Sequence, residues 1–310
     1  MPRFKTILVT GANGFLGRHL VDELVNNMKY FVYAVGREYS QVHSNYEENE
    51  NFEFIRCDLN NKGDYNNIPE DIDVVFHLAS VIPDNNSAVN DVDYLNTNVT
   101  GTYDFFTHLK TLTSINKIVF SSSILVYSFS KGGILNEAMI PEPDSLYGIS
   151  KLTGEHLVKT MFCDKVYSVL RFSSIYGHGQ RQGTVLPTFI KRARNNETIY
   201  IYGKGNRLQN FIFIEDAIKS LLLCLELDSI CVCNIGSSRS TSTLELAETI
   251  IKVFNSKSQI ESVGREDDGF SVELDLTTAK QKLHFEDMHL LKDGLNKIYQ
   301  KINYCNNEKN

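Results

Sequence analysis

The sequence predicts an α/β protein built on an open, parallel, doubly wound sheet. Short runs of β-branched and aromatic residues alternate with helical patterns from residue 6 to about residue 170, which is typical of such a sheet. A glycine-rich turn follows the first run directly. With 310 residues the chain can bury a large core, either as one large α/β domain or as a domain with a smaller lobe.

The expected elements are short strands and amphipathic helices whose apolar residues follow the period of each type. Strands are predicted at residues 6–10, 30–35, 52–57, 73–80, 117–123 and 166–172. Helices are predicted at 19–25, at 95–112 and after Tyr147, and a loop or poorly ordered helix at 38–51. Beyond residue 172 the pattern is less regular, with helices at 186–194, 215–226 and 243–254, a strand and turn at 199–205, and strands at 210–214 and 231–235.

The glycine-rich turn, between the first strand and the first helix, is Gly11-Ala12-Asn13-Gly14-Phe15-Leu16-Gly17. Glycines let a backbone approach a pyrophosphate closely, and a helix N-terminus offers free N–H groups to it. The spacing is Gly-x-x-Gly-x-x-Gly, and its place between a strand and a helix is the one that a dinucleotide-binding turn requires. The alternative is an ordinary glycine turn.

The residues after the second and third strands bear on which dinucleotide would bind. Gly36-Arg37 stands where many NAD sites have an acidic residue for the ribose 2′-hydroxyl, and a guanidinium there suits a 2′-phosphate. This favours NADP slightly over NAD, unless Arg37 is a solvated surface residue. Asp58 is a candidate acceptor for an adenine amino group, or else a helix cap. His77, in the fourth strand, is expected to be a packing residue rather than a base or ligand.

Tyr147 and Lys151 form the candidate catalytic pair. Ser145 is expected to cap the helix that contains them, which puts both side chains on one helical face. A free tyrosine has a pKa near ~10, and a neighbouring ammonium lowers it towards the range of a general acid or base. About one Tyr-x-x-x-Lys is expected by chance in a chain of this composition. Ser123 supports the pair, because it ends the fifth strand at the sheet edge where ligands bind.

Composition and charge argue against several other classes of protein. The net charge of −7 argues against general binding to nucleic acid. The six cysteines form no Cys-x-x-Cys pair and no cluster with histidines, so no metal site is expected. Free buried thiols suit a reducing cytoplasm. The N-terminal residues resemble neither a signal peptide nor a membrane anchor, and no run is long and apolar enough to span a bilayer.

The motifs occur in a fixed order along nearly the whole chain: Gly11-x-x-Gly14-x-x-Gly17, His77-Leu78-Ala79, Asn98, Ser121-Ser122-Ser123, Tyr147-x-x-x-Lys151, Arg171-x-x-x-x-Tyr176-Gly177, residues 201–205, residues 211–216 and Asn234-Ile235-Gly236. The ordered set resembles the extended short-chain dehydrogenase/reductase family of NAD(P)-dependent nucleotide-sugar epimerases, dehydratases and reductases. The resemblance implies a Rossmann-type sheet with a smaller C-terminal lobe for the substrate. Residues 1–170 would form the dinucleotide-binding domain, and residues 171–310 mainly the nucleotide-sugar-binding lobe, with some segments returning to the sheet.

The resemblance also implies a role for each matched residue. Tyr147 would be the general acid or base, Lys151 would bind the nicotinamide ribose and lower the pKa of Tyr147, and Ser123 would bond the oxygen that is oxidised or reduced. The other implied dinucleotide contacts are Gly11, Asn13, Gly14, Phe15, Leu16, Gly17, Arg37, Asp58, Leu59, Leu78, Ala79, Ser80 and Asn98. The implied substrate contacts besides Ser123 are Ser174, Leu186, Tyr202, Arg207 and Arg265.

Three sites in the expected lobe depart from the family pattern. Ser174 stands where the family has an asparagine before Tyr-Gly, which weakens its implied substrate contact. Gln209-Asn210 replaces the usual Arg-Asp, so binding of a diphosphate would depend on Arg207 or Arg265. His178 follows Tyr176-Gly177 where a proline is usual, and is either a second proton donor or a loop residue.

Two functions share this expected site. A 4-epimerase would oxidise C4 of a nucleotide hexose with tightly held NAD and return the hydride to the other face. A reductase of a 4-keto-6-deoxy nucleotide sugar would consume NADPH, which Gly36-Arg37 favours. A 4,6-dehydratase is rejected, because Ile124 and Leu125 replace the Asp-Glu pair that removes water in that branch. A non-catalytic dinucleotide-sensing protein is disfavoured, because the serine, tyrosine and lysine are all retained.

The expected partners are a nucleotide sugar and a second copy of the chain, with no nucleic acid and no membrane. The family usually forms homodimers through a four-helix bundle, which here would contain the helix at 95–112 and the helix after Tyr147. The apolar positions expected at that interface are Phe105, Leu109, Leu157 and Met161.

Overall fold

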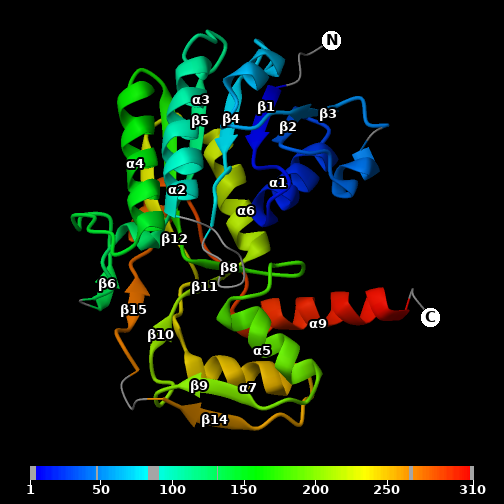
Figure 1. Cartoon of the computed structure of the whole chain (residues 1–310), viewed down its shortest axis with the longest axis vertical. Helices are drawn as coiled ribbons and strands as arrows, with labels where there is room; N and C mark the ends of the chain where they lie inside the picture. The colour runs from blue at the N-terminus through cyan, green and yellow to red at the C-terminus, as the bar shows by residue number, and fades with distance from the viewer. Residues whose placement is uncertain (1–4, 47, 83–90, 131, 265–267, 308–310) are drawn as a thin grey trace.

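A seven-stranded parallel sheet forms the centre of the structure (Figure 1). The computed structural model describes residues 5–46, 48–82, 91–130, 132–264 and 268–307. The strand order is β12-β7-β5-β4-β1-β2-β3, with bounds Lys5–Thr10 (β1), Tyr30–Gly36 (β2), Phe52–Arg56 (β3), Val74–His77 (β4), Lys117–Ser123 (β5), Val166–Phe172 (β7) and Cys231–Ile235 (β12). The order reverses between β1 and β4, so the sheet is doubly wound and the predicted fold class is confirmed.

Helices cover both faces of this sheet (Figure 1). On one face α1 (Phe15–Asn26) lies beside α6 (Ile214–Leu223), and on the other α3 (Thr102–Leu109) lies beside α4 (Leu146–Met161). Successive strand residues point to opposite faces, so Val119 joins the core under α1 and α6 while Ile118 joins the core under α3 and α4. Burial on both faces explains why these strands are continuous apolar runs.

Three strands have the predicted bounds, and β4 is shorter than predicted. β5, β7 and β12 match the expected ranges residue for residue. β4 ends at His77 rather than at residue 80. The backbone N–H groups of Leu78 and Ala79 both donate to the Thr10 hydroxyl at 3.2 Å, so the chain leaves the sheet ladder there. β12 pairs with β7, which returns one segment from beyond residue 170 to the main sheet; the division at residue 170 stays a prediction.

The helix expected at 95–112 consists of several pieces. α2 (Asp91–Asp93) leads into a π-helix, η3 (Tyr94–Gly101), and then into α3. π-Helical turns are rare and frequently lie at functional sites. Phe105 and Leu109 are fully buried in the core of their own chain, so the prediction that these two residues lie at a dimer interface is wrong. Leu157 and Met161 are half-buried against the same core.

The remaining elements form the second lobe and several short connections. Figure 1 shows α5, α7, β9 and β14 together at the end opposite the N-terminus. Ser242 caps α7 as expected, since its hydroxyl accepts from the Glu245 N–H at 3.1 Å. The bounds are β6 (Gly133–Leu135), β8 (Ser174–Tyr176), α5 (Val185–Arg194), β9 (Ile199–Tyr202), β10 (Leu208–Gln209), β11 (Phe211–Phe213), β13 (Thr241–Ser242), α7 (Thr243–Val253), β14 (Ile260–Val263), β15 (Val272–Leu274), α8 (Thr277–Lys282) and α9 (Leu291–Asn307), with 3₁₀ turns at Gln41–Tyr46, Lys62–Asn67, Ile124–Val126 and Cys224–Glu226.

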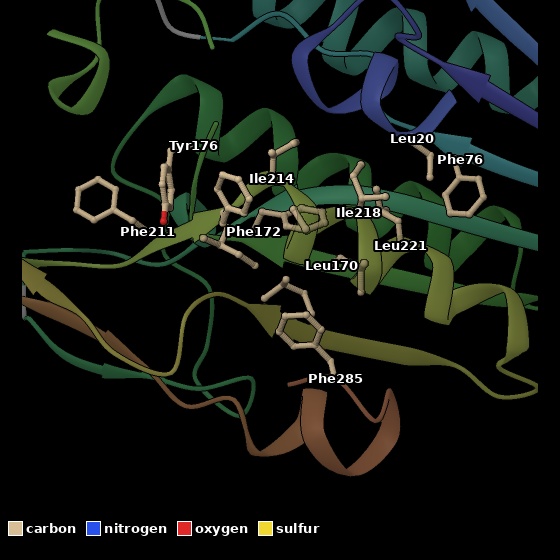
Figure 2. Close-up of a cluster of buried hydrophobic side chains, with 14 of the residues drawn as sticks. Leu20, Phe76, Leu170, Phe172, Tyr176, Phe211, Ile214, Ile218, Leu221 and Phe285 are labelled. Atoms are coloured by element: carbon tan, nitrogen blue, oxygen red, sulfur yellow. The ribbon is translucent and has the colours of Figure 1, made fainter. Parts of the chain in front are cut away.

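One apolar core joins the lobe to the sheet. Figure 2 shows Phe172 of β7, Tyr176 of β8 and Phe211 of β11 with Ile214 of α6 and Phe285. β8 and β11 pair in parallel just beyond the main sheet. The lobe is therefore anchored at the carboxyl ends of the strands, the edge where ligands bind in open α/β sheets.

No helix in the described ranges is long and apolar enough to cross a membrane.

Gly154 sets the distance between α4 and the sheet. A Cβ atom added there would lie 2.3 Å from Cζ of Phe120 on β5, which is too close for any real contact. We expect Gly154→Ala to lower the free energy of unfolding by about 1–2 kcal/mol, because overpacking costs more than the roughly 1 kcal/mol gained in helix propensity.

Urea unfolding of the variant measures this change. Thr160→Ala, on the exposed face of the same helix, is the control and should alter the free energy by less than about 0.5 kcal/mol. A midpoint for Gly154→Ala at or above that of the unaltered protein would contradict the packing argument.

Candidate active site

The first turn of α4 holds Tyr147 against the segment that follows β5. Ser145 caps the helix as predicted, since its hydroxyl accepts from the Gly148 N–H at 3.1 Å. A Cβ atom added at Gly148 would lie 2.1 Å from the Leu125 carbonyl oxygen. The helix therefore begins in direct backbone contact with residues 124–126, and this contact brings Tyr147 and Ser123 to the same edge of the sheet.

The three consecutive serines at the end of β5 have different roles. The Ser121 carbonyl accepts from Lys151 Nζ at 2.8 Å, and the Ser122 hydroxyl donates to Glu155 Oε1 at 2.5 Å. The Ser123 hydroxyl accepts from the Leu125 N–H at 3.2 Å. An acceptor bond leaves the hydroxyl hydrogen of Ser123 available. Ser123, at the end of the strand, thus keeps a hydroxyl hydrogen that it can donate to a substrate oxygen.

Lys151 lies almost entirely out of solvent, at 4% exposure. Its Nζ is 5.3 Å from the ring centroid of Phe120 and 5.7 Å from that of Tyr147. Burial lowers the pKa of Lys151 to about 7, and the Glu155 carboxylate opposes this effect. The ammonium is therefore held close to the point at which it loses its charge at neutral pH.

Tyr147 does not show the lowered pKa that the sequence predicts. Burial raises its pKa well above the ordinary value, a hydrogen bond with the Ser80 side chain partly opposes this, and the nearby Tyr94 adds to it. Burial outweighs the proximity of Lys151, whose own pKa is lowered to about 7. The protein alone thus holds Tyr147 as a neutral phenol, a proton donor.

Asn98, in the π-helix, connects three segments around Tyr147. Its Oδ1 accepts from the Val81 N–H at 2.7 Å, and its Nδ2 donates to the Val81 carbonyl and to the Ser150 hydroxyl at 3.0 and 3.1 Å. The Ser150 hydroxyl in turn donates to the Tyr147 carbonyl at 2.8 Å. Asn98 thereby positions the residues after β4 relative to the first turn of α4.

The glycine turn fits a pyrophosphate. Gly11 has φ +69°, and a Cβ added there would lie 2.7 Å from the Ala79 nitrogen. A Cβ at Gly17 would lie 2.2 Å from the Gly11 carbonyl oxygen. α1 begins at Phe15, and no side chain caps its start, so the N–H groups of its first turn are free for an anion.

The predicted dinucleotide contacts at the ends of β2 and β3 lie beside this turn. Asn13 Nδ2 donates to the Glu38 carbonyl at 2.7 Å, which ties the turn to the residues after β2. Arg37 is exposed at that point. Asp58 Oδ1 accepts from the Asn60 N–H in a local turn. The Leu59 side chain is buried in the core. Leu59 can therefore contact a ligand only through its backbone.

Leu78, Ala79 and Ser80 follow β4 and are partly exposed at the same edge. His77, just before them, is buried and bridges the hydroxyls of Thr10 and Thr102 at 3.1 and 3.2 Å. Burial lowers its pKa to about 3, so the ring is neutral. His77 also stacks on Phe120, which fits the expected packing role.

The residues predicted to bind substrate do not form one contact set. Ser174 is exposed on β8 and Tyr202 is 79% exposed at the end of β9. Arg207 is partly exposed, and its Nε donates to the Phe270 carbonyl at 3.2 Å. The Leu186 side chain is 2% exposed and packs in the core, so its predicted contact with substrate is not supported by its position. Arg265 lies outside the described residues.

Asn210 and His178 have local structural surroundings. Asn210 Nδ2 donates to the Ser237 carbonyl, and its Oδ1 accepts from the Ser237 N–H, so its side chain holds a loop instead of a phosphate. Burial together with Lys301 and Arg18 lowers the pKa of His178. Arg18 also donates to the Gly179 carbonyl at 2.7 Å. These contacts suit the loop-residue interpretation of His178.

Ser122, Ser150 and Glu155 take part in the site, although the sequence assigned no role to any of them. Glu155 follows Lys151 by four residues, a spacing that places side chains side by side on a helix. This spacing could have identified Glu155 as a neighbour of Lys151. No sequence pattern identified Ser150, because a serine inside a helix is common. Within the described part of the chain, no group of three or more His, Cys, Asp or Glu side chains is placed to hold a metal ion.

Comparisons with known proteins agree with this geometry. The model of the NAD dependent epimerase/dehydratase family matches residues 7–236. A Methanocaldococcus jannaschii protein with the provisional name UDP-glucose 4-epimerase is 31% identical over 97% of this chain and 98% of its own length. A dTDP-D-glucose 4,6-dehydratase of Dictyostelium discoideum is 28% identical over 80% of this chain and 62% of its own.

Solved structures show the same fold over the whole chain. The UDP-glucuronic acid 4-epimerase of Bacillus cereus, in complex with UDP-glucuronic acid and NAD, superposes with a TM-score of 0.86 at 28% identity. The match covers 97% of this chain and 99% of that one. Together with the glycine turn and the serine, tyrosine and lysine at the sheet edge, these matches confirm the resemblance found in the sequence. The chain belongs to the NAD dependent epimerase/dehydratase family.

Proposed function

We propose that the chain is a nucleotide-sugar 4-epimerase that acts on a UDP-hexose. The observation that carries this proposal is the Ser123 hydroxyl, which accepts from the Leu125 N–H and so keeps its hydrogen to donate at the sheet edge where α4 holds Tyr147 and Lys151. The family match supports it. So do the relative and the solved structure above, whose names specify 4-epimerases of UDP sugars.

The proposed chemistry uses Tyr147 and Ser123 on one substrate oxygen. A bound nicotinamide dinucleotide supplies the hydride acceptor and donor. When the C4 hydroxyl is oxidised, the phenolate form of Tyr147 takes its proton, and when the ketone is reduced, the neutral phenol returns that proton to the oxygen. The Ser123 hydroxyl donates to the same oxygen and stabilises the negative charge that develops there. Inversion requires the keto sugar to present its other face between the two steps.

The chain's own residues suit the dinucleotide at three places. Gly11, Gly14 and Gly17 allow close approach of a pyrophosphate to the start of α1. Lys151 Nζ lies at the sheet edge with two of its three donors unused among the described residues, which suits ribose hydroxyls. The positive charge of Lys151, once held by such contacts, would lower the pKa of Tyr147 towards the range of a base.

We propose that the chain does not act as a 4,6-dehydratase, although some of its relatives carry that name. Ile124 is buried in a small apolar cluster with Val126 and Leu135. Removal of water from a sugar needs an acid and a base next to the reacting carbons. Ile124 and Leu125 offer neither group at the positions that follow Ser123.

We also propose a homodimer and a reducing cytoplasmic location. The π-helix, α3 and α4 each carry an exposed apolar side chain, namely Leu95, Tyr103 and Ile149. We expect these three residues at the dimer interface in place of Phe105 and Leu109. Five cysteines in the described part of the chain are free thiols. Cys231 and Cys233 are among them with their sulfur atoms 3.7 Å apart, which suits a compartment that keeps thiols reduced.

Removal of the Tyr147 hydroxyl tests the assigned acid and base. We expect Tyr147→Phe to lower kcat for UDP-hexose epimerisation by about 10²–10⁴-fold, the usual range for general acid–base catalysis, while dinucleotide binding persists. Steady-state assays and fluorescence titration with NADH measure the two effects. Tyr30→Phe is the control and should leave kcat unchanged, because Tyr30 begins β2 at the opposite edge of the sheet from the site. Full turnover by Tyr147→Phe would refute the assignment.

A second candidate function is reduction of a 4-keto-6-deoxy nucleotide sugar with NADPH. Arg37, exposed beside the glycine turn, is the observation that favours it. Mass spectrometry of the purified protein separates the two candidates, because a 4-epimerase should retain NAD and a reductase should bind NADPH from solution.

Substitution of Arg37 tests cofactor choice directly. If Arg37 meets a 2′-phosphate, Arg37→Ala should raise the Kd for NADPH about tenfold or more and leave the Kd for NADH unchanged. Arg56→Ala, at the exposed end of the neighbouring strand, is the matched control. An unchanged ratio of the two dissociation constants in Arg37→Ala would show that this guanidinium has no part in cofactor choice.

A further inference from the structure

A buried carboxylate stands one helical turn beyond Lys151. Glu155 is 8% exposed, and residues four apart on a helix are neighbours on one face. Its carboxylate is fixed from two strands: Arg171 of β7 donates from Nε to Oε1 at 2.9 Å and from Nη2 to Oε2 at 2.7 Å, and the Ser122 hydroxyl of β5 donates to Oε1. Two parallel bonds from a guanidinium give a rigid geometry.

Arg171 is itself held from the next strand. Its Nη1 donates to the Tyr127 hydroxyl at 2.7 Å, and that hydroxyl donates to Asn234 Oδ1 on β12 at 2.9 Å. The Asn234 N–H donates to Glu137 Oε1 at 2.7 Å. The side chain of Glu155 is therefore immobilised by a buried network that reaches across three strands of the sheet.

The groups that face Lys151 from the surrounding elements are few. β4 contributes the neutral ring of His77, β5 the Ser121 carbonyl and the Phe120 ring, and α4 itself the Tyr147 phenol and the Glu155 carboxylate. Among these described groups, Glu155 is the one that carries a negative charge. The Arg171 guanidinium pairs with this carboxylate at 2.7 Å.

We propose that Glu155 is a positioning residue that keeps the Lys151 side chain charged and directed along the active-site face of α4. The inference rests on the proposed function, in which a charged Lys151 holds the ribose and assists Tyr147. Arg171 and Ser122 hold Glu155, Glu155 stabilises the Lys151 ammonium, and the Ser121 carbonyl orients it. A buried lysine without a carboxylate loses its proton readily, so the network sets the upper pH limit of the site.

Removal of the charge on Glu155 tests the proposal in the full-length protein. Glu155→Gln should lower the pKa of Lys151 by about one unit. The pKa is measured by NMR titration of protein labelled with ¹³C-lysine, with the signal assigned from Lys151→Arg. The descending limb of the pH profile of kcat should move down by the same amount. Activity should then fall about tenfold at pH 8 and about twofold at pH 6.

Two further variants separate electrostatics from folding. Glu155→Asp keeps the charge and should restore the pKa of Lys151. Glu155→Gln combined with Arg171→Met removes the unpaired guanidinium that threatens folding in the single variant, and should still lower that pKa. A structural role alone would reduce kcat equally at all pH values with an unchanged pKa of Lys151, and that result would overturn the proposal.

The NMR titration also distinguishes failure of this inference from failure of the proposed function. It reports on Lys151 without turnover. A lowered pKa in Glu155→Gln together with no epimerisation of any UDP-hexose would refute the function and leave the electrostatic inference standing.

Discussion

The burial of the Lys151 ammonium is the constraint on which the arrangement of the candidate active site depends. Removing a charge from water is costly unless hydrogen bonds and an opposite charge offset the loss. Here the Ser121 carbonyl supplies the bond, and Glu155 supplies the opposite charge from the same helix. The compensation is incomplete, because the pKa of Lys151 is still lowered to about 7. The site thus holds a lysine whose charge responds to whatever binds beside it.

That burial is possible because α4 lies unusually close to the sheet. Gly148 contacts the Leu125 carbonyl and Gly154 contacts the Phe120 ring, at distances that leave no room for a Cβ atom. Asn98 fixes the same helix from the other side through Ser150. Tight packing at the two glycines, together with the Asn98–Ser150 bond, therefore determines where Tyr147 stands relative to the serines of β5.

The sequence predicted those features that depend on local pattern. β5, β7 and β12 were placed to the residue because each contains a short apolar run, as strands buried on both faces do. The π-helix around Asn98 was missed, since a shift in backbone hydrogen bonds leaves the apolar pattern unchanged. The direction of the Tyr147 pKa was wrong because it depends on burial, which the spacing to Lys151 does not report. The pairing of Glu155 with Arg171 joins residues sixteen apart on different elements, and no local pattern specifies it.

The most direct test of the account follows the hydrogen at C4 of a UDP-hexose. The sugar carries deuterium at C4 and is incubated with the purified protein without added NADPH, and the products are followed by NMR. The account predicts a sugar with inverted configuration at C4 that still carries the deuterium, because the hydride taken from C4 returns to the same carbon. Absence of inversion, or loss of deuterium from the inverted product, would contradict it.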